Sequence, residues 1–216
     1  MARLLYIEAS PRQDRSVSSR VAGEFLTGYR ETNPDDEIDH LALFRDPLPP
    51  FGGEAADQKM QQIMQLATGG ETIAAEGEWA GVVREIERFK AADKVLISSP
   101  MWNFSIPWTL KQYLDIICQP GLTFYVNREG EYVGMVTGRP LQLILSSGSE
   151  YAMRFPREED GTKTDFQRAY LEHAARFVGF EDIRCIKLQP AAAPPKIAEP
   201  MLAEKMAAAR AAGADF

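Results

Sequence analysis

Two hydrophobic patterns alternate along the chain. Short runs of consecutive apolar residues are typical of strands that are buried on both faces of a parallel sheet. Longer stretches with an apolar residue every three or four positions are typical of helices with one buried face. The short runs predict strands at about 4–7, 37–44, 94–97, 141–145 and 182–188. The longer stretches predict helices at about 18–29, 56–68, 78–92, 105–119, 164–179 and 198–212.

This order predicts parallel strands joined by right-handed crossovers. The five strands and the helices between them fit a doubly wound α/β sandwich of three layers, and residues 1–216 are expected to form a single domain. Three parts interrupt the alternation. Residues 46–53 are rich in Pro and Gly and residues 151–163 are polar, so both predict loops, whereas residues 123–133 predict a small hairpin.

Three loops follow core strands and carry unusual side chains. They are Ser10–Ser18, Pro100–Pro107 and Ser146–Ser149. In a doubly wound sheet, ligands bind beyond the carboxyl ends of the strands, where such loops meet. The sequence therefore predicts one site at this edge.

The first loop offers hydroxyls that could serve a ligand or the chain itself. Ser10, Ser16 and Ser18 precede a helix, and the N–H groups at a helix start attract phosphate. The alternative is that Ser16 and Ser18 merely cap the helix, which loop statistics alone favour. The loop lacks both GxGxxG and GK[ST], which disfavours a Rossmann dinucleotide site and a Walker loop.

The second loop combines large apolar residues in a way that exposed turns rarely do. Met101, Trp102 and Phe104 surround Asn103. Such side chains could form the walls of a site for a flat aromatic ligand, while backbone amides bind its polar edge. The alternative is that the loop packs under a neighbouring helix or at a dimer interface.

These loops resemble those of the FMN-dependent NADH:azoreductase and quinone reductase family, whose members are flavodoxin-like homodimers. The resemblance extends from Met1 to the last predicted strand. It rests on Ser10 with Ser16-Val17-Ser18, on Gly121-Leu122-Thr123-Phe124, and on the string Pro-Met-Trp-Asn-Phe-Ser-Ile-Pro-Trp-Thr-Leu-Lys-Gln-Tyr-Leu-Asp that begins at Pro100.

The resemblance implies a flavodoxin-like sandwich with a five-stranded parallel sheet and one FMN per subunit. It assigns the FMN phosphate to the first loop, the isoalloxazine ring to the second and the rest of the flavin pocket to the third. The corresponding residues are Ser10, Ser16, Val17 and Ser18, then Met101, Trp102, Asn103 and Phe104, then Ser146, Ser147, Gly148 and Ser149.

The third loop departs from the family pattern Ser-Arg-Gly-Gly. Ser147 replaces the arginine and Ser149 replaces the last glycine. The first change removes a positive charge near the flavin, and the second places a side chain where positive φ would be strained. The following segment, 150–163, is longer than is usual in the family and is expected to affect the choice of substrate.

The implied activity is the transfer of two electrons from NADH or NADPH to quinones or azo compounds by a ping-pong mechanism. The flavin carries the chemistry, so no catalytic side chain is required. Four aromatic residues are candidates for stacking the acceptor, namely Phe124, Tyr125, Tyr151 and Phe155.

Two other functions stay open at this point. A flavodoxin-type carrier would bind FMN and pass single electrons to a protein partner, although the chain is longer than a carrier needs. A hydrolase would use Ser147 or Ser149 as nucleophile, but no G-x-S-x-G motif occurs and neither histidine has an evident link to these serines.

Composition narrows the partners further. The chain has 24 Lys and Arg against 31 Asp and Glu, a net charge of −7, which disfavours nucleic acid and anionic membranes. No signal peptide is recognisable, and no metal site is expected from two histidines and two cysteines. A cytoplasmic location is therefore expected.

Three further residues have no predicted catalytic role. Cys118 is predicted to be buried, and His173 is predicted to be buried or to lie in an interface. The neighbouring Arg184 could lower the pKa of Cys185, but nothing else indicates a reactive thiol.

Overall fold

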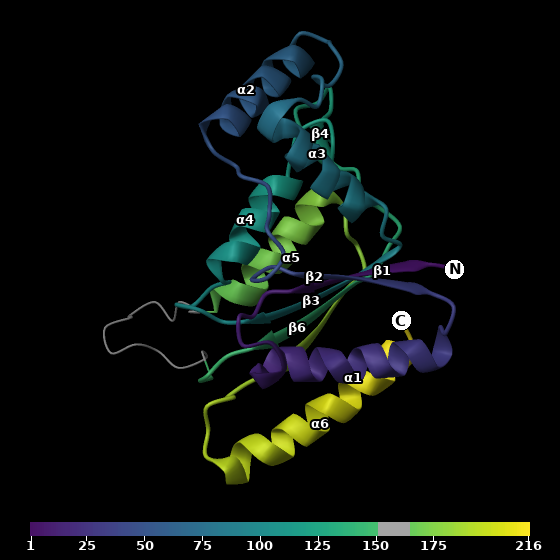
Figure 1. Ribbon diagram of the computed structural model, residues 1–216, viewed down its shortest axis with the longest axis vertical. Coiled ribbons are helices and arrows are strands. Elements are labelled where there is room, and N and C mark those ends of the chain that lie inside the picture. The colour runs from purple at the N-terminus through teal and green to yellow at the C-terminus, as the bar shows by residue number, and fades with distance from the viewer. Residues whose placement is uncertain (151–164) are drawn as a thin grey trace.

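A central parallel sheet organises the molecule, shown in Figure 1 as a computed structural model that describes residues 1–150 and 165–216. Within these residues the sheet has five strands in the order β2-β1-β3-β6-β7. The strands are β1 (Arg3–Glu8), β2 (Glu37–Ala42), β3 (Lys94–Pro100), β6 (Leu141–Ser146) and β7 (Ile183–Leu188). Numbered among themselves, they have the 2-1-3-4-5 order of flavodoxin-like proteins. The predicted fold is confirmed.

Helices cover both faces of the sheet (Figure 1). One face is covered by α1 (Val17–Thr32) and α6 (Pro195–Ala214), and the other by α3 (Gly77–Lys90), α4 (Trp108–Ile117) and α5 (Phe166–Val178). Farther from the sheet lie α2 (Gly53–Ala67) and the predicted hairpin, formed by β4 (Phe124–Val126) and β5 (Tyr132–Gly134). A 3-10 turn at Gln13–Arg15 precedes α1.

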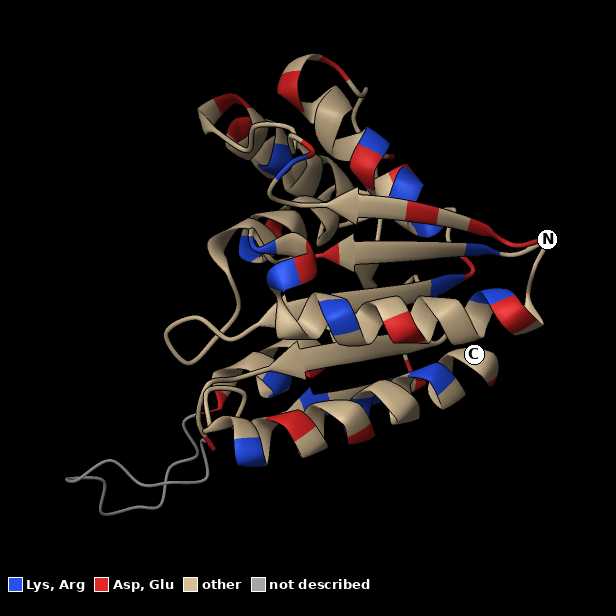
Figure 2. Cartoon of the chain, turned by 60° about the horizontal axis from the view of Figure 1, so that its bottom comes forward, with Lys and Arg blue, Asp and Glu red and all other residues tan. Residues whose placement is uncertain are grey.

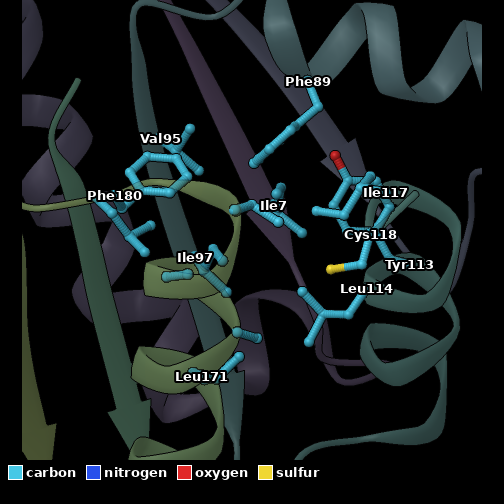
Figure 3. Close-up of a pocket in the computed structure, with 14 residues that line it drawn as sticks. Ile7, Phe89, Val95, Ile97, Tyr113, Leu114, Ile117, Cys118, Leu171 and Phe180 are labelled. Carbon is cyan, nitrogen blue, oxygen red and sulfur yellow. The ribbon is translucent and has the colours of Figure 1, made fainter. Parts of the chain in front are cut away.

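Alternate residues of each strand pack into two separate apolar clusters. On β1, Leu4 and Tyr6 pack toward α1 and α6, whereas Leu5 and Ile7 pack toward α3, α4 and α5. The cluster that packs toward α3, α4 and α5 encloses a cavity of about 20 Å³ between these three helices and the sheet. The walls of this cavity are apolar (Figure 3). The hydroxyl of Tyr113 is buried there without a hydrogen-bond partner. This small apolar cavity is part of the core and not a site for a polar ligand.

Two glycines allow α1 and α6 to pack closely. A Cβ atom at Gly28 would collide with the backbone of Arg210 on α6, and one at Gly213 would collide with the backbone of Phe25 on α1. The close packing therefore requires glycine on both helices.

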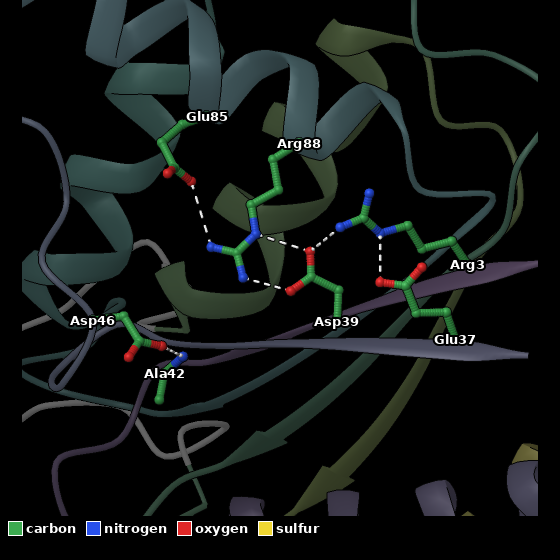
Figure 4. A network of polar contacts seen from close by, with 7 residues as sticks. All are labelled: Arg3, Glu37, Asp39, Ala42, Asp46, Glu85 and Arg88. Carbon is green, nitrogen blue, oxygen red and sulfur yellow. Dashed lines mark hydrogen bonds and ion pairs between the residues drawn. The ribbon is translucent and has the colours of Figure 1, made fainter.

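Charged side chains of both signs lie on the helices and toward the amino ends of the strands (Figure 2). At that end Asp39 of β2 accepts hydrogen bonds from Arg88 at 2.9 and 2.5 Å and from Arg3 at 2.8 Å (Figure 4). Arg3 also forms an ion pair with Glu37 at 3.6 Å, and Arg88 forms one with Glu85 at 3.8 Å. These contacts join β1, β2 and α3.

Two predicted boundaries are wrong. The fourth helix does not begin at Ser105, because the backbone of Ser105 pairs with that of Trp102, so α4 begins after Pro107. The last helix begins earlier than residue 198, at Pro195, since a proline in the first turn removes an N–H group that the helix does not need.

The prediction that His173 is buried is also wrong. His173 is exposed, and Phe166, on the same stripe of α5, is 51% exposed. The helix instead turns a stripe of mostly smaller side chains toward the sheet, including Leu171, Ala174 and Ala175. Small residues allow the helix to approach the sheet closely, so Tyr170 and Phe177 pack at the border of the core, whereas Phe166 and His173 stay exposed.

Candidate functional site

The three predicted loops meet in one cavity at the carboxyl edge of the sheet. Its volume is about 270 Å³, enough for a ligand much larger than water. The walls come from the loops after β1, β3, β6 and β7. They are formed by Ser10, Pro11, Arg12, Ser16, Val17, Pro100, Met101, Trp102, Ser146, Ser147, Gly148, Ala191 and Ala192.

One end of the cavity is the start of α1. Ser16 occupies the N-cap position, yet its hydroxyl makes no capping bond to the helix. It lies 3.1 Å from the hydroxyl of Ser18 instead. The first turn of α1 contains no acidic side chain that would neutralise the helix dipole, and the exposed Arg12 adds a positive charge. Simple capping by Ser16 is therefore excluded, and the arrangement suits an anion.

The second loop forms a tight turn with an unfavourable backbone. The N–H group of Trp102 donates to the carbonyl of Ser105 at 2.9 Å, and the reverse bond measures 3.0 Å. Between them, Asn103 and Phe104 have positive φ values of 45° and 71°. Asparagine tolerates this conformation, but phenylalanine is strained in it, and such strain is concentrated at functional sites.

This turn is only partly covered. Trp102 is 37% exposed and Phe104 is 38% exposed, and the N–H group of Phe166 at the start of α5 donates to the carbonyl of Phe104 at 3.0 Å. Packing against described neighbours therefore leaves part of both apolar side chains exposed. Trp102 lines the cavity, whereas Asn103 and Phe104 lie farther along the turn.

The third loop, Ser146–Ser149, is held by hydrogen bonds and does not show the backbone strain that was expected at Ser149. The N–H group of Met101 donates to the carbonyl of Ser146 at 2.7 Å, which links the second and third loops. The Ser147 hydroxyl donates to the Ser149 carbonyl at 3.1 Å. Neither Gly148 nor Ser149 has a positive φ, so the serine in place of glycine is accommodated without strain.

Sequence reasoning missed a fourth wall, the connection between β7 and α6. The N–H group of Ala191 donates to the Ser147 carbonyl at 2.8 Å, and that of Ala192 donates to the Gly148 carbonyl at 3.0 Å. The rule that selected the first three loops applies equally to this one, because it also follows a parallel strand. It was overlooked because Ala and Pro side chains carry no functional group.

A buried carboxylate lies just before the first loop. Glu8 ends β1, and its Oε2 atom lies 3.1 Å from Nε2 of His40 on the edge strand. Burial alone would raise the pKa of Glu8, but the hydrogen bond with His40 and the charge of Arg45 outweigh it and lower the pKa. The His40 ring also stacks on Tyr6, with ring centroids 4.6 Å apart. His40 thus has a structural role.

Two of the four predicted acceptor-stacking residues, Phe124 and Tyr125, do not line the cavity of their own chain. Phe124 packs on Phe177, with centroids 4.4 Å apart. Tyr125 lines a different groove, beside Ile63 of α2. Tyr151 and Phe155 lie outside the described residues.

Neither cysteine is a reactive group. Burial raises the pKa of both Cys118 and Cys185 to about 11. The neighbouring Arg184 does not lower the pKa of Cys185, since Arg184 binds Asp182 at 2.7 Å. The Ser147 hydroxyl lies 3.3 Å from Oε1 of Gln189, whose amide oxygen is not a general base, so the described contacts do not support a hydrolase.

Within residues 1–150 and 165–216, no helix is long and apolar enough to cross a membrane.

The sheet order and the position of the cavity define a protein of the flavodoxin-like class. A family model described as "Flavodoxin-like fold" matches residues 2–212.

Relatives narrow this class. The chain is 46% identical over 195 residues to the FMN-dependent NADH:quinone oxidoreductase of Nitratidesulfovibrio vulgaris strain DP4, covering 89% of this chain and 88% of that protein. It is 39% identical to FMN-dependent NADH:quinone oxidoreductase 1 of Bradyrhizobium diazoefficiens, covering 90% and 89%.

Among solved structures, an FMN-dependent NADH-azoreductase of Bacillus anthracis in complex with FMN is similar, with a TM-score of 0.75, 27% identity and coverage of 97% and 98%. A second azoreductase of Bacillus anthracis has a TM-score of 0.83 over the full length of both chains at 24% identity, which shows the shared fold. The chain belongs to the flavodoxin-like family of FMN-dependent NADH:quinone oxidoreductases and azoreductases, and it is an oxidoreductase.

Proposed function

We propose that residues 1–216 form one flavodoxin-like FMN-binding unit that transfers two electrons from NADH or NADPH to quinones or azo compounds. One observation carries the proposal, namely a cavity that has an uncapped helix start at one end and the Trp102 indole in its wall. A phosphate and an aromatic ring system are the two recognition elements of FMN. The names of the relatives support the same cofactor and donor.

The donor groups present fit this cofactor. Hydroxyls of Ser10 and Ser16, the start of α1 and the Arg12 guanidinium suit a phosphate dianion. We assign the phosphate to Ser10, Ser16, Val17 and Ser18, the ring system to Met101, Trp102, Asn103 and Phe104, and the remaining polar groups to Ser146, Ser147, Gly148 and Ser149.

The flavin, when bound, supplies a centre that accepts hydride from a pyridine nucleotide and returns it to an acceptor. The chain's own contribution is to position rings and exclude water. Trp102 offers a flat wall against which rings can align, and the N–H groups of the loops can donate to polar edges. Because donor and acceptor would enter the same cavity in turn, the proposed kinetics are ping-pong.

The proposal includes a homodimer and a cytoplasmic location. An apolar groove of about 520 Å³ lies between α2 and β4, where Tyr125 is 46% exposed and Val126 is 54% exposed. A second subunit could cover this groove. Phe124 and Tyr125 lie away from the cavity of their own subunit, so they would reach a flavin only as part of the partner's site. Both cysteines are free, in keeping with a reducing compartment.

The decisive experiment is an absorption spectrum of protein that has been supplied with FMN and desalted. Anaerobic addition of NADH or NADPH should bleach the retained flavin, and a quinone should restore the colour. Loss of all flavin on desalting, with no recovery of activity at high FMN concentration, would contradict the proposal.

The electron-carrier alternative has a distinct outcome. A carrier would retain flavin that neither NADH nor NADPH bleaches, but that a protein partner reduces. The size of the relatives and their names disfavour it. Sedimentation of the holoprotein tests the dimer separately from the reaction.

A further inference from the structure

Three aromatic rings contact one another in a row that begins at the cavity, with Phe44 between Trp102 and Trp108. Trp102 lines the cavity, and its ring centroid lies 5.6 Å from that of Phe44, which follows β2. Phe44 in turn makes an edge-to-face contact with Trp108 at 6.0 Å. We call Trp102, Phe44 and Trp108 the aromatic shelf.

The outer end of the shelf is exposed. Trp108 is the first residue of α4 and is 65% exposed, although the next helix positions, Thr109 and Leu110, are buried. Leaving an indole in water is unfavourable, so an exposed indole that contacts other rings is typical of a surface that binds a ligand. Its outer face has no other described ring against it.

The position of the shelf favours a neutral occupant with several rings. The ring planes meet at 57° between Trp102 and Phe44 and at 82° between Phe44 and Trp108, so the shelf offers ring edges as well as ring faces. An acceptor with several rings that is held beside Trp102 can extend toward Trp108 and contact these rings in turn. The adenine of a pyridine nucleotide would have to bring its charged diphosphate across the same apolar rings, which costs hydration.

We propose that the aromatic shelf selects multi-ring acceptors, and that Trp108 is the specificity-determining residue at its outer end. This inference rests on the proposed function. Rings stack on Trp108 by offset or edge-to-face contact, as aromatic pairs prefer. Acceptors with a single ring stay within the cavity and do not reach Trp108.

The test compares Trp108→Ala and Trp108→Phe in the FMN-loaded protein with 1,4-benzoquinone and 9,10-phenanthrenequinone as acceptors. Trp108→Ala should raise the KM for phenanthrenequinone about five- to tenfold relative to that for benzoquinone, the size of one aromatic contact. Trp108→Phe should restore most of the difference. Ile197→Ala, which removes an apolar side chain that is 56% exposed on α6, is the control and should leave the ratio unchanged.

A binding measurement separates this inference from the proposed reaction. The dissociation constant of 9-phenanthrol, which is not an electron acceptor, should rise by a similar factor in oxidised Trp108→Ala protein. If the unchanged protein reduces no quinone, the proposed function fails while this measurement still tests the shelf.

Three results would overturn the inference. The first is an equal change, or none, for both quinones and 9-phenanthrol. The second is a rise in KM for NADH with no rise for reduced nicotinamide mononucleotide, which would assign the shelf to adenine. The third is dissociation of a dimer in Trp108→Ala, which would assign it to the subunit contact.

Discussion

The two edges of the same sheet differ in how their polar groups are satisfied. At the amino edge, Asp39 binds two guanidinium groups, and carboxylates of β2 and α3 form ion pairs with the same two arginines. At the carboxyl edge, the Ser16 hydroxyl leaves the helix start uncapped, Trp102 stays exposed, and Phe104 has a positive φ. The amino edge pairs its charged side chains within the chain, although Nε of Arg3 and Oε2 of Glu85 make no hydrogen bond, whereas the carboxyl edge keeps groups available for a ligand.

This difference shows that stability and binding are separated in space. The amino edge can be optimised for folding because nothing has to enter it. The carboxyl edge keeps unfavourable features that a bound cofactor would offset. Substitutions at the two edges should therefore affect different measurements.

The largest effect is expected from Asp39→Ala. This substitution leaves Arg88 and Arg3 without their shared partner. Hydrogen bonds to charged groups contribute about 1.5–3 kcal/mol each to stability. The loss is smaller than the sum of these contributions because both guanidinium groups can gain contacts with water. We expect the free energy of unfolding to fall by about 2–3 kcal/mol in urea titrations, with FMN affinity unchanged. Asp182→Ala breaks an exposed pair with Arg184 and should change stability by less than about 1 kcal/mol.

The same network should respond to acid. The hydrogen bond from Arg88 holds the pKa of Asp39 below its usual value of 3.8. A carboxylate with a depressed native pKa stabilises the fold above its unfolded pKa and loses this effect as pH falls through the native value. The gap in stability between the unchanged protein and Asp39→Ala should therefore be constant at neutral pH and shrink below about pH 4.

The next effect concerns the other edge. Ser16→Ala removes a hydroxyl assigned to the phosphate and should weaken FMN binding about tenfold or more, as expected for a hydrogen bond to a charged group. Its free energy of unfolding without FMN should fall by only about 1 kcal/mol, because the hydroxyl makes no capping bond and its loss removes only the contact with the buried Ser18 hydroxyl. Ser19→Ala, with a buried hydroxyl outside the cavity, is the control. Equal FMN affinity in both variants would remove Ser16 from the site.

A smaller effect is expected in the core. Tyr113→Phe deletes a buried hydroxyl without a partner and should raise the free energy of unfolding by about 1 kcal/mol. Tyr29→Phe removes the hydrogen bond from Tyr29 to Asp36 at 2.7 Å and should lower it by about 1 kcal/mol. Destabilisation by Tyr113→Phe would show that an ordered water satisfies the hydroxyl.

The smallest effect is expected at the thiols. With a pKa of about 11 for Cys118 and Cys185, roughly one thiol in a thousand is ionised at pH 8. Alkylation by iodoacetamide, followed by mass spectrometry, should be negligible in the native protein and complete in urea. Rapid alkylation of Cys118 or Cys185 in the native protein would contradict this prediction. It would show a reactive thiol outside the cavity at the carboxyl edge.

The pattern of apolar residues was sufficient to predict the sheet, because strands buried on both faces consist of uninterrupted apolar runs. It was insufficient for α5, where two stripes compete. The aromatic stripe with Phe166 and His173 is more hydrophobic in appearance, but the smaller Leu171 and Ala174 face the sheet. The size of the side chains decided which face of α5 turns toward the sheet. Which size fits depends on the distance between the helix layer and the sheet, and this distance cannot be derived from the sequence.

For the site, three of four loops were predicted because their side chains are chemically distinctive. The fourth, at Ala191 and Ala192, contributes only backbone groups, so composition could not reveal it. The positive φ of Phe104 was likewise beyond prediction, since it follows from the two bonds between Trp102 and Ser105.

The close contact between α1 and α6 also has a consequence for biosynthesis. α6 follows every other described element in the chain, so it leaves the ribosome after them. Until then the α1 surface around Phe25 has no cover from α6, although the strands beside it have already been made. The helix assigned to the phosphate therefore acquires this support only after translation has passed Gly213.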